Sequence, residues 1–231
     1  MGEGEDMEER IKEIFMKLGA DLCGIAGADR FGDTPEGFRP ADIYSECRSV
    51  VVFAKALPKG TAKVDPRIIY QHFNSMGPVE LDRIAYNGAF EIEKEFGGIA
   101  VPLPSDGPYD SWDAEKLEGR GLISMKHAAV MAGIGSLGKN TLLMNRIYGN
   151  MISVGAVLTD MDLASDPFAE ELCMKSCRLC VESCPVNAIG GGTVSQYLCR
   201  THAYGNNSRG FPVVNCNRCR VVCPLAFGAK K

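Results

Sequence analysis

Eight of the ten cysteines lie close together near the end of the chain, in two similar runs. The first run reads Cys-x3-Cys-x2-Cys-x3-Cys-Pro and begins at Cys173, and the second reads Cys-x2-Cys-x3-Cys-Pro and begins at Cys216. The bacterial ferredoxin run, Cys-x2-Cys-x2-Cys-x3-Cys-Pro, holds 4Fe-4S clusters through soft thiolate ligands. The spacing therefore predicts two such clusters and one-electron chemistry.

The second run lacks a leading cysteine, because Val213 stands where one is expected. Cys199, alone between the runs, can supply the missing thiolate. In two-cluster ferredoxins the last cysteine of each run binds the other cluster. The predicted ligand sets are therefore Cys173, Cys177, Cys180 and Cys223 for one cluster, and Cys184, Cys199, Cys216 and Cys219 for the other.

Structural zinc is the main alternative, since paired Cys-x2-Cys knuckles often bind zinc. Zinc sites do not require a further Cys-x3-Cys-Pro element, which occurs here twice. Disulfides are the weakest alternative, because the expected compartment is reducing. The two cysteines outside the runs, Cys23 and Cys47, lie in apolar surroundings and read as small buried hydrophobic residues.

Composition narrows the functional classes. The net charge of −4 predicts no overall basic field, so neither nucleic acid nor an anionic membrane is an expected partner. No stretch has the roughly 18 uncharged apolar residues that a membrane helix needs. The start, "MGEGEDMEER", is acidic and has no apolar signal-peptide core. We expect a cytoplasmic protein.

The elements that must position the cysteines are read from periodicity. Apolar spacing predicts helices over residues 7–19, 78–98 and 122–133, and strands over 20–27, 49–57, 98–103 and 151–160. A Pro/Gly-rich loop is expected up to residue 113, and "DMDLASDPFAEE" reads as an acidic linker. The predicted fold class is α/β (α+β) over residues 1–165, followed by a two-cluster ferredoxin-like domain over 166–231.

The segment "GIGSLGKNT" begins at Gly133 and contains two nucleotide-binding patterns, G-x-G-x-x-G and G-x4-G-K. Both patterns require a preceding strand and a following helix, but a helical stretch comes first here. Asn140 also replaces the Ser or Thr that a phosphate-binding loop needs after its lysine. A plain tight turn and a contact with a different cofactor are the readings that remain.

The segment from Lys126 to Asp160 resembles epoxyqueuosine reductases, in which a helix leads through Ala-Gly-Leu-Gly-Trp-Ile-Gly-Lys to a strand ending Leu-Thr-Asp. Two cysteine runs follow at the same distance, and Cys199 matches the lone cysteine between the runs of that family. The resemblance covers about residues 10–225. It depends on a distinctive turn and a distinctive ferredoxin variant occurring in the same order.

This resemblance implies a fold, cofactors and partners. The N-terminal domain would have the fold of flavin nitroreductases and reductive dehalogenases, and would hold a corrinoid (cobalamin) supplied with electrons by two 4Fe-4S clusters. A ferredoxin or flavodoxin-type protein would donate the electrons, and the substrate would be small or nucleoside-like. The residues implied to line the corrinoid are Gly133, Gly135, Gly138, Lys139, Asn140 and Thr141.

The proton donor of the family is an acidic residue upstream of the helix before the turn. Here Glu118 is nearest to that position, with Asp113 and Glu115 further away, and His127 is a second candidate. Ser136 and Leu137 replace the usual Trp-Ile pair. Since the chain is acidic and stops before the helical extension of many of those enzymes, the sequence does not lead us to expect a nucleic acid partner.

Three functions remain open. The first is a corrinoid-dependent reductase with iron–sulfur clusters. The second is an electron-transfer ferredoxin whose first domain only docks a partner, and the third is a flavin-dependent reductase. About 55–60 residues suffice for a two-cluster ferredoxin, so the long leading segment favours an enzyme. Fold alone does not choose between corrinoid and flavin.

Overall fold

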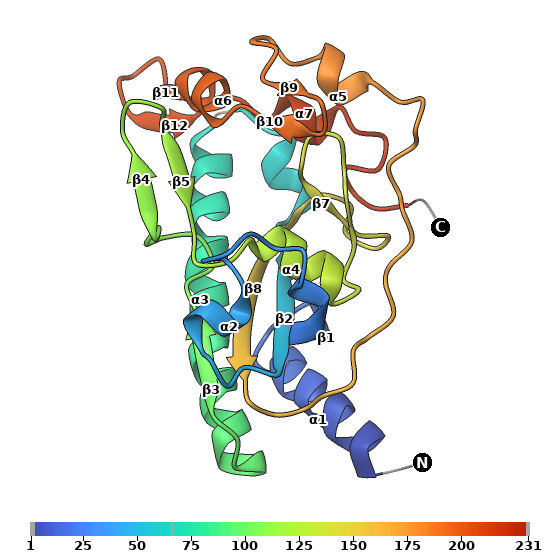
Figure 1. Ribbon diagram of the computed structural model, residues 1–231. Coiled ribbons are helices and arrows are strands. Elements are labelled where there is room, and N and C mark those ends of the chain that lie inside the picture. The colour runs from blue at the N-terminus through green and yellow to red at the C-terminus, as the bar shows by residue number, and fades with distance from the viewer. Residues whose placement is uncertain (1–2, 66, 230–231) are drawn as a thin grey trace.

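The computed structural model describes residues 3–65 and 67–229. Its centre is an antiparallel sheet in the order β1, β2, β8, β3. The strands are β1 (Leu22–Gly27), β2 (Ser49–Ala56), β8 (Ile152–Thr159) and β3 (Ala100–Leu103). The long strands β2 and β8 form the middle of the sheet, and helices cover both faces (Figure 1).

Helices α1 (Glu3–Lys17) and α3 (Ile68–Phe96) cover one face of the sheet. Phe15 of α1 is fully buried and stacks on Phe53 of β2, with ring centroids 4.9 Å apart. Gly88 of α3 makes this possible, because a Cβ there would overlap the Phe15 ring. The two helices therefore meet over one aromatic side chain.

Truncation of Phe15 tests this packing. We expect Phe15→Ala to lower the free energy of unfolding by about 3–5 kcal/mol, because it leaves a cavity between α1, α3 and the sheet. Met16→Ala, at a position that is 45% exposed on the same helix, is the control. Urea unfolding followed by circular dichroism measures both. A cost below about 1 kcal/mol for Phe15→Ala would show that the surrounding side chains collapse into the space.

Helix α4 (Met125–Met131) covers the opposite face. Ala128 and Ala129 are fully buried in the same apolar cluster as Val50 and Val52 of β2, and their small side chains let the helix lie close to the strand. The first unit thus has a helix–sheet–helix arrangement. The predicted mixed α/β class is confirmed, and its purely antiparallel sheet makes it the α+β form.

The acidic linker after β8 follows the free edge of β1. The Asp166 carboxylate accepts the Ile25 amide at 2.8 Å, and the Ser165 hydroxyl accepts the Gly27 amide at 2.7 Å. Lys12 of α1 pairs with Asp166 at 2.9 Å. The linker therefore packs on the first unit and carries the chain along the sheet to the cysteines at the other end (Figure 1).

The cysteine region consists of short elements. Each cysteine run contains a one-turn helix, α5 (Leu179–Glu182) or α7 (Arg218–Val221), and these two helices contact each other. Between them lies α6 (Gln196–Ala203), which carries Cys199. Two small hairpins complete the region: β9 (Ile189–Gly190) with β10 (Thr193–Val194), and β11 (Tyr204–Asn206) with β12 (Pro212–Val214).

The remaining elements are short. They are η1 (Ala28–Phe31), α2 (Pro40–Ile43), η2 (Lys59–Ala62), β4 (Ser111–Asp113), β5 (Glu118–Arg120), β6 (Ser136–Leu137) and β7 (Leu143–Met144). Within the described residues, no helix is long and apolar enough to cross a membrane.

Two predicted boundaries differ from the structure. Helix α3 starts at Ile68 and runs through Pro78, ten residues before its predicted start. Its added turns are held by the cysteine region, since Gln71 accepts the Val214 amide at 2.8 Å. The predicted loop before residue 113 continues into a hairpin of β4 and β5, whose turn is closed by Asp113 accepting the Glu115 and Lys116 amides.

Candidate functional site

The first group of cysteine thiols combines three residues of the first run with the last cysteine of the second. Burial raises the pKa of Cys223, and so do the nearby thiols of Cys173, Cys180 and Cys177. Burial raises the pKa of Cys180 too, together with Cys173 and Cys177. The thiol of Cys223 therefore lies close enough to the thiols of the first run for their charges to affect its pKa. Exchanged ligands would require this proximity.

The second group contains Cys199. Burial raises its pKa, followed by the thiols of Cys216 and Cys184. Burial also raises the pKa of Cys219, to about 11, with Cys199 and Cys216 contributing. Cys180 has a smaller effect on Cys219, so the two groups adjoin. The lone cysteine therefore lies beside the trio that it was predicted to complete.

The donor chemistry of these groups fits iron–sulfur clusters. All eight thiols are half-buried, so they are neither in the core nor freely exposed. The Ala188 amide lies 3.3 Å from the Cys184 sulfur, a contact of the kind that tunes cluster potentials. Among the described residues, no group of three or more His, Cys, Asp or Glu side chains is arranged to hold a single metal ion. The ligand sets stay a prediction.

The glycine turn contacts the first cysteine run through Lys139. Its ammonium group donates hydrogen bonds to the carbonyl oxygens of Met174, Lys175 and Cys177, at 2.8, 2.6 and 2.7 Å. All three acceptors lie in the loop from Cys173 to Cys177, where the run carries its inserted residue. Lys139 therefore positions this loop, and the contact with the corrinoid that the family resemblance implied stays a prediction.

The residue after Lys139, Asn140, forms a hydrogen bond to the second cysteine run. Asn140 is 6% exposed, and its amide donates to the Cys219 carbonyl oxygen at 2.9 Å. Its own carbonyl accepts the Leu142 amide at 3.3 Å, which shapes the turn. Adjacent side chains thus fasten both cysteine runs to one turn. Thr141 lies at φ +55°, where the backbone reverses between β6 and β7.

The glycines of the turn make room for the protein itself. A Cβ at Gly133 would overlap the Pro167 carbonyl of the linker, and one at Gly135 would overlap the Met144 carbonyl of β7. At Gly138, the Asn140 side-chain oxygen would lie 2.8 Å away. A helix precedes this turn and a hairpin contains it, so the structural context of a nucleotide loop is absent from this segment. Corrinoid lining by these residues stays a prediction.

A second turn, at Gly149 and Asn150, contacts the second cysteine run and the residues that follow it. Asn150 is 1% exposed and donates to the Arg220 carbonyl at 3.0 Å, while the Arg220 guanidinium donates back to the Asn150 carbonyl. Gly149 has φ +63°, and a Cβ there would overlap the Leu225 carbonyl. Together with the glycine turn, this contact joins the cysteine region to the first unit. The boundary predicted at residues 165 and 166 remains a prediction.

His127 lies at the exposed start of α4. Its Nδ1 atom is 2.7 Å from the hydroxyl of Ser124, the residue that begins the helix. This contact is local and orients the ring. Beside it, the Lys126 side chain is exposed, and partial desolvation lowers the pKa of its ammonium group, as does the positive charge of Arg220. The sequence did not single out Lys126, which becomes a third candidate proton donor.

The lowered pKa of Lys126 predicts a pH-dependent stability. Between the folded pKa and the usual value of 10.5, the unfolded chain binds the extra proton, so stability rises with pH. Lys126→Met should therefore raise the melting temperature at pH 7, and the gain should shrink as the pH approaches 10.5. Thermal melts across this range measure it, with Lys59→Met as a control. An equal gain at every pH would contradict the assigned cause.

Glu118 lies on β5, in a hairpin that is clamped to α6. The Gln196 side chain both accepts the Gly119 amide, at 3.1 Å, and donates to the Gly119 carbonyl, at 3.2 Å. Arg200 donates to the Tyr109 hydroxyl at 3.2 Å and lies over the Trp112 ring. The hairpin that carries Glu118 is thereby joined to the helix that carries Cys199.

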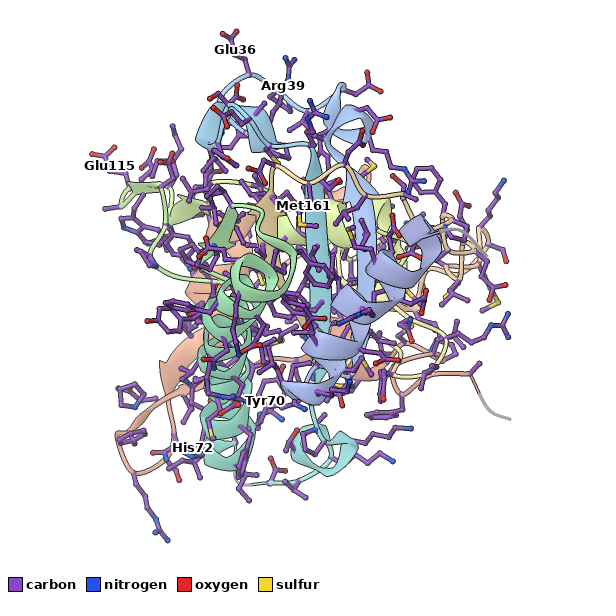
Figure 2. The ribbon with its side chains drawn as sticks, turned by 90° about the horizontal axis from the view of Figure 1, so that it is seen from below. Glu36, Arg39, Tyr70, His72, Glu115 and Met161 are labelled. Atoms are coloured by element: carbon purple, nitrogen blue, oxygen red, sulfur yellow. The ribbon has the colours of Figure 1, made fainter. Side chains whose placement is uncertain are left out.

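The remaining acidic candidates, Asp113 and Glu115, lie in the β4–β5 hairpin. Asp113 closes its hairpin turn, and the backbone amide of Lys116 holds its pKa below the usual range. Figure 2 shows Glu115 at the outer tip of that hairpin and His72 pointing away from α3. His72 and His202 are both exposed. His202 follows Cys199 by three residues on α6, whereas the other three residues lie outside the cysteine region.

The two cysteines outside the runs behave as packing residues. Cys47 is 7% exposed, and burial raises its pKa. Burial also raises the pKa of Cys23, far above its usual range. Both thiols therefore stay protonated at neutral pH, in agreement with the sequence expectation.

Two surface hollows lie outside the cysteine groups. One, of about 520 Å³, is lined by Ser45, Glu46, Cys47, Arg48 and Asp160. The other, of about 470 Å³, lies beside α3 and includes Phe73, Met76 and Tyr148. Neither hollow is lined by a cysteine of the two runs or by a residue of the glycine turn.

Comparisons with known proteins show which proteins this sequence resembles. No protein-family model matches it. An epoxyqueuosine reductase of Listeria monocytogenes is 33% identical over 120 residues, which cover 47% of this chain and 31% of that protein. An epoxyqueuosine reductase of Gloeobacter violaceus is 28% identical over 234 residues, which cover 95% of this chain and 69% of the relative. The first of these alignments thus covers less than a third of the relative.

Solved structures share the fold. An epoxyqueuosine reductase bound to a modified tRNA-Tyr stem loop superposes with a TM-score of 0.66 at 17% identity, covering 96% of this chain and 66% of that one. A catabolic reductive dehalogenase with 3-bromo-4-hydroxybenzoic acid gives 0.68 at 21% identity, covering 94% and 31%. A B12-dependent reductive dehalogenase gives 0.67 at 20% identity, covering 98% and 34%.

One expectation needs correction. The acidic composition did not lead us to expect a nucleic acid partner, but a protein of this fold was solved with a tRNA stem loop. That expectation is withdrawn. The predicted resemblance, in contrast, is confirmed by relatives in sequence and by neighbours in structure. This chain is similar in sequence to epoxyqueuosine reductases, and it has the fold that those enzymes share with reductive dehalogenases.

Proposed function

We propose that this protein is an iron–sulfur reductase in which two 4Fe-4S clusters deliver single electrons to a corrinoid held by the first unit. The observation that carries the proposal is the grouping of the cysteines. Cys223 shares a charge neighbourhood with the first run, and Cys199 shares one with Cys184 and Cys216. Exchange of the last cysteines is the wiring of two-cluster ferredoxins.

The corrinoid would supply low-potential cobalt chemistry for a reductive elimination. The protein would orient the substrate and supply a proton. Lys126 and His127 at the start of α4 and Glu118 on the clamped hairpin are the candidate donors. The pKa of Lys126 is lowered, so this residue releases its proton more easily than an ordinary lysine does. The Arg200 clamp would fix the hairpin against the second cysteine group.

The substrate class is proposed as small or nucleoside-like. Since a protein of the same fold binds a modified tRNA stem loop, a nucleoside within RNA belongs to this class. The alternatives are an electron carrier without its own chemistry and a flavin-dependent reductase. They differ from the proposed enzyme in what the first unit binds.

Anaerobic purification tests the proposal. We expect about eight iron and eight sulfide per chain and a broad absorption band at about 400 nm. Incubation with cobalamin should give a bound corrinoid with a base-off spectrum, and incubation with FMN should give none. Proton transfer is then tested with Lys126→Gln, His127→Gln and Glu118→Gln, by comparing the pH dependence of turnover with one candidate substrate after another.

Each outcome has a clear reading. A colourless zinc protein contradicts the cluster assignment. Full iron with no corrinoid and tight FMN binding favours a flavin enzyme. Full iron with neither cofactor, together with rapid electron exchange with a partner protein, favours the carrier.

A further inference from the structure

Charge is distributed unevenly along this chain. Residues 173–231 contain eight Lys and Arg side chains and one Glu, a net charge of +7. Residues 1–172 contain 17 basic and 28 acidic side chains, a net charge of −11. Figure 1 places the cysteine region at one end of the molecule and the N-terminus at the other. Within the described residues 173–229, six basic side chains and one acidic side chain give a net charge of +5, so the cysteine end stays slightly positive even after two oxidised clusters with their thiolates add about −4.

One surface of this end combines cations with apolar side chains. The stretch from Met174 to Leu179, which ends at the first residue of α5, exposes Met174 to 54% and Leu179 to 43%, and Lys175 and Arg178 in the same stretch are exposed too. Arg218, exposed at the start of the neighbouring α7, adds a third cation. We call these five residues the α5–α7 face.

The cations of this face are available for a partner. Arg178 contacts Glu182 at 3.4 Å, and both side chains are more than 60% exposed, so this pair is weak. Within the described residues, Lys175 and Arg218 have no acidic side chain within 4.0 Å. Arg178 directly follows Cys177, and Arg218 directly precedes Cys219. Positive charge is thus concentrated where the cysteines come nearest to one another in the fold.

We propose that the α5–α7 face is the docking surface for an acidic electron-carrier protein that reduces the cluster held by Cys173, Cys177, Cys180 and Cys223. This inference rests on the proposed function, and it adds the place where electrons enter. The reduced carrier loses one electron and the cluster gains it, with no bond made or broken. A negative carrier is steered to the positive end and repelled by the acidic first unit.

The composition of the face favours a protein over RNA. Exposed apolar side chains with a charged rim are typical of small transient protein interfaces. Sites for single-stranded RNA stack bases on aromatic rings. The α5–α7 face has no aromatic residue among its five, whereas the exposed Tyr197, Tyr204 and Phe211 belong to the α6 and β11–β12 side of the region.

Charge reversal tests the docking surface. The variant Lys175→Glu/Arg218→Glu is compared with Lys17→Glu/Lys94→Glu, which changes the net charge equally on exposed lysines of α1 and α3. Anaerobic stopped-flow spectroscopy follows cluster bleaching by a reduced plant-type ferredoxin, which is acidic, and by dithionite. We expect the α5–α7 variant to slow reduction by ferredoxin roughly 10-fold or more at low salt, and the control variant by less than about 2-fold.

Salt and dithionite complete the design. Raising the ionic strength from about 50 to about 500 mM should slow the unaltered protein and barely affect the α5–α7 variant. Dithionite should reduce all three proteins equally. Equal slowing of both variants, or slowing of neither, overturns the proposal. Loss of RNA oligonucleotide binding in the α5–α7 variant, with ferredoxin rates unchanged, also overturns it and identifies RNA as the occupant. Absence of iron would instead contradict the proposed function.

Discussion

Replacing Cys223 by serine is expected to expose three cysteines that lie about 45 residues earlier in the chain. If Cys223 completes the first group, its loss removes that cluster and frees Cys173, Cys177 and Cys180, while Cys216 and Cys219 stay protected by the second cluster. Anaerobic alkylation with iodoacetamide followed by peptide mass spectrometry reads each thiol separately. Iron should fall from about eight to about four per chain.

The matched variant is Cys184→Ser. It should free Cys199, Cys216 and Cys219 and leave the thiols of the first run protected. Local wiring predicts the reverse pattern in both variants, so the two schemes are separated by which peptides are alkylated. Cys47→Ser, at a buried cysteine outside the runs, should change neither iron content nor alkylation.

Replacing Lys139 by methionine is expected to lower both the stability of the protein and its iron content. The ammonium group donates to three carbonyl oxygens of the first run, and its removal leaves all three without that donor. We expect a loss of about 2–4 kcal/mol in the free energy of unfolding. The Cys173–Cys177 loop should loosen, with lower iron content and faster alkylation of these two thiols.

The conservative change separates positioning from charge. Lys139→Arg keeps the charge and several donors, so it should retain more iron than Lys139→Met. Lys17→Met removes an exposed lysine of α1 and serves as the control. Electron paramagnetic resonance of the reduced protein provides a readout beyond stability, because a loosened loop should change the signal of the first cluster alone. Full iron and an unchanged spectrum in Lys139→Met would refute the positioning role.

Cys223 and Lys139 show which features of the site can be predicted from the sequence and which cannot. Cysteine spacing carries its own chemistry, so the sequence alone predicts the grouping of Cys223 with the first run, and the nearby thiols of that run raise the pKa of Cys223. The partners of Lys139 are main-chain carbonyls, which are present at every residue and leave no trace in sequence. Resemblance to a family therefore suggested a cofactor contact, although the side chain lies against the cysteine loop.

The same contrast holds for the fold. The buried helical stripe of α3 was correctly predicted from Leu81, Ile84, Ala85 and Ile92, because burial imposes a period on side chains. Its earlier turns were missed because proline usually ends a helix, and their stabilising contact comes from Val214, far along the chain. The β4–β5 hairpin was missed for a similar reason: its strands have three residues each and depend on contacts with α6.

The acidic linker after β8 does more than connect the sheet to the cysteine region. Strand β1 is an outer strand, so its outward amides would otherwise offer a template for another chain. Ser165 and Asp166 occupy the amides of Gly27 and Ile25, and the Asp166 amide returns a bond to the Ile25 carbonyl. The segment that leads to the cysteines therefore also covers the open edge of the sheet, so a substitution at Ser165 or Asp166 would both expose that edge and loosen the connection between the two parts of the protein.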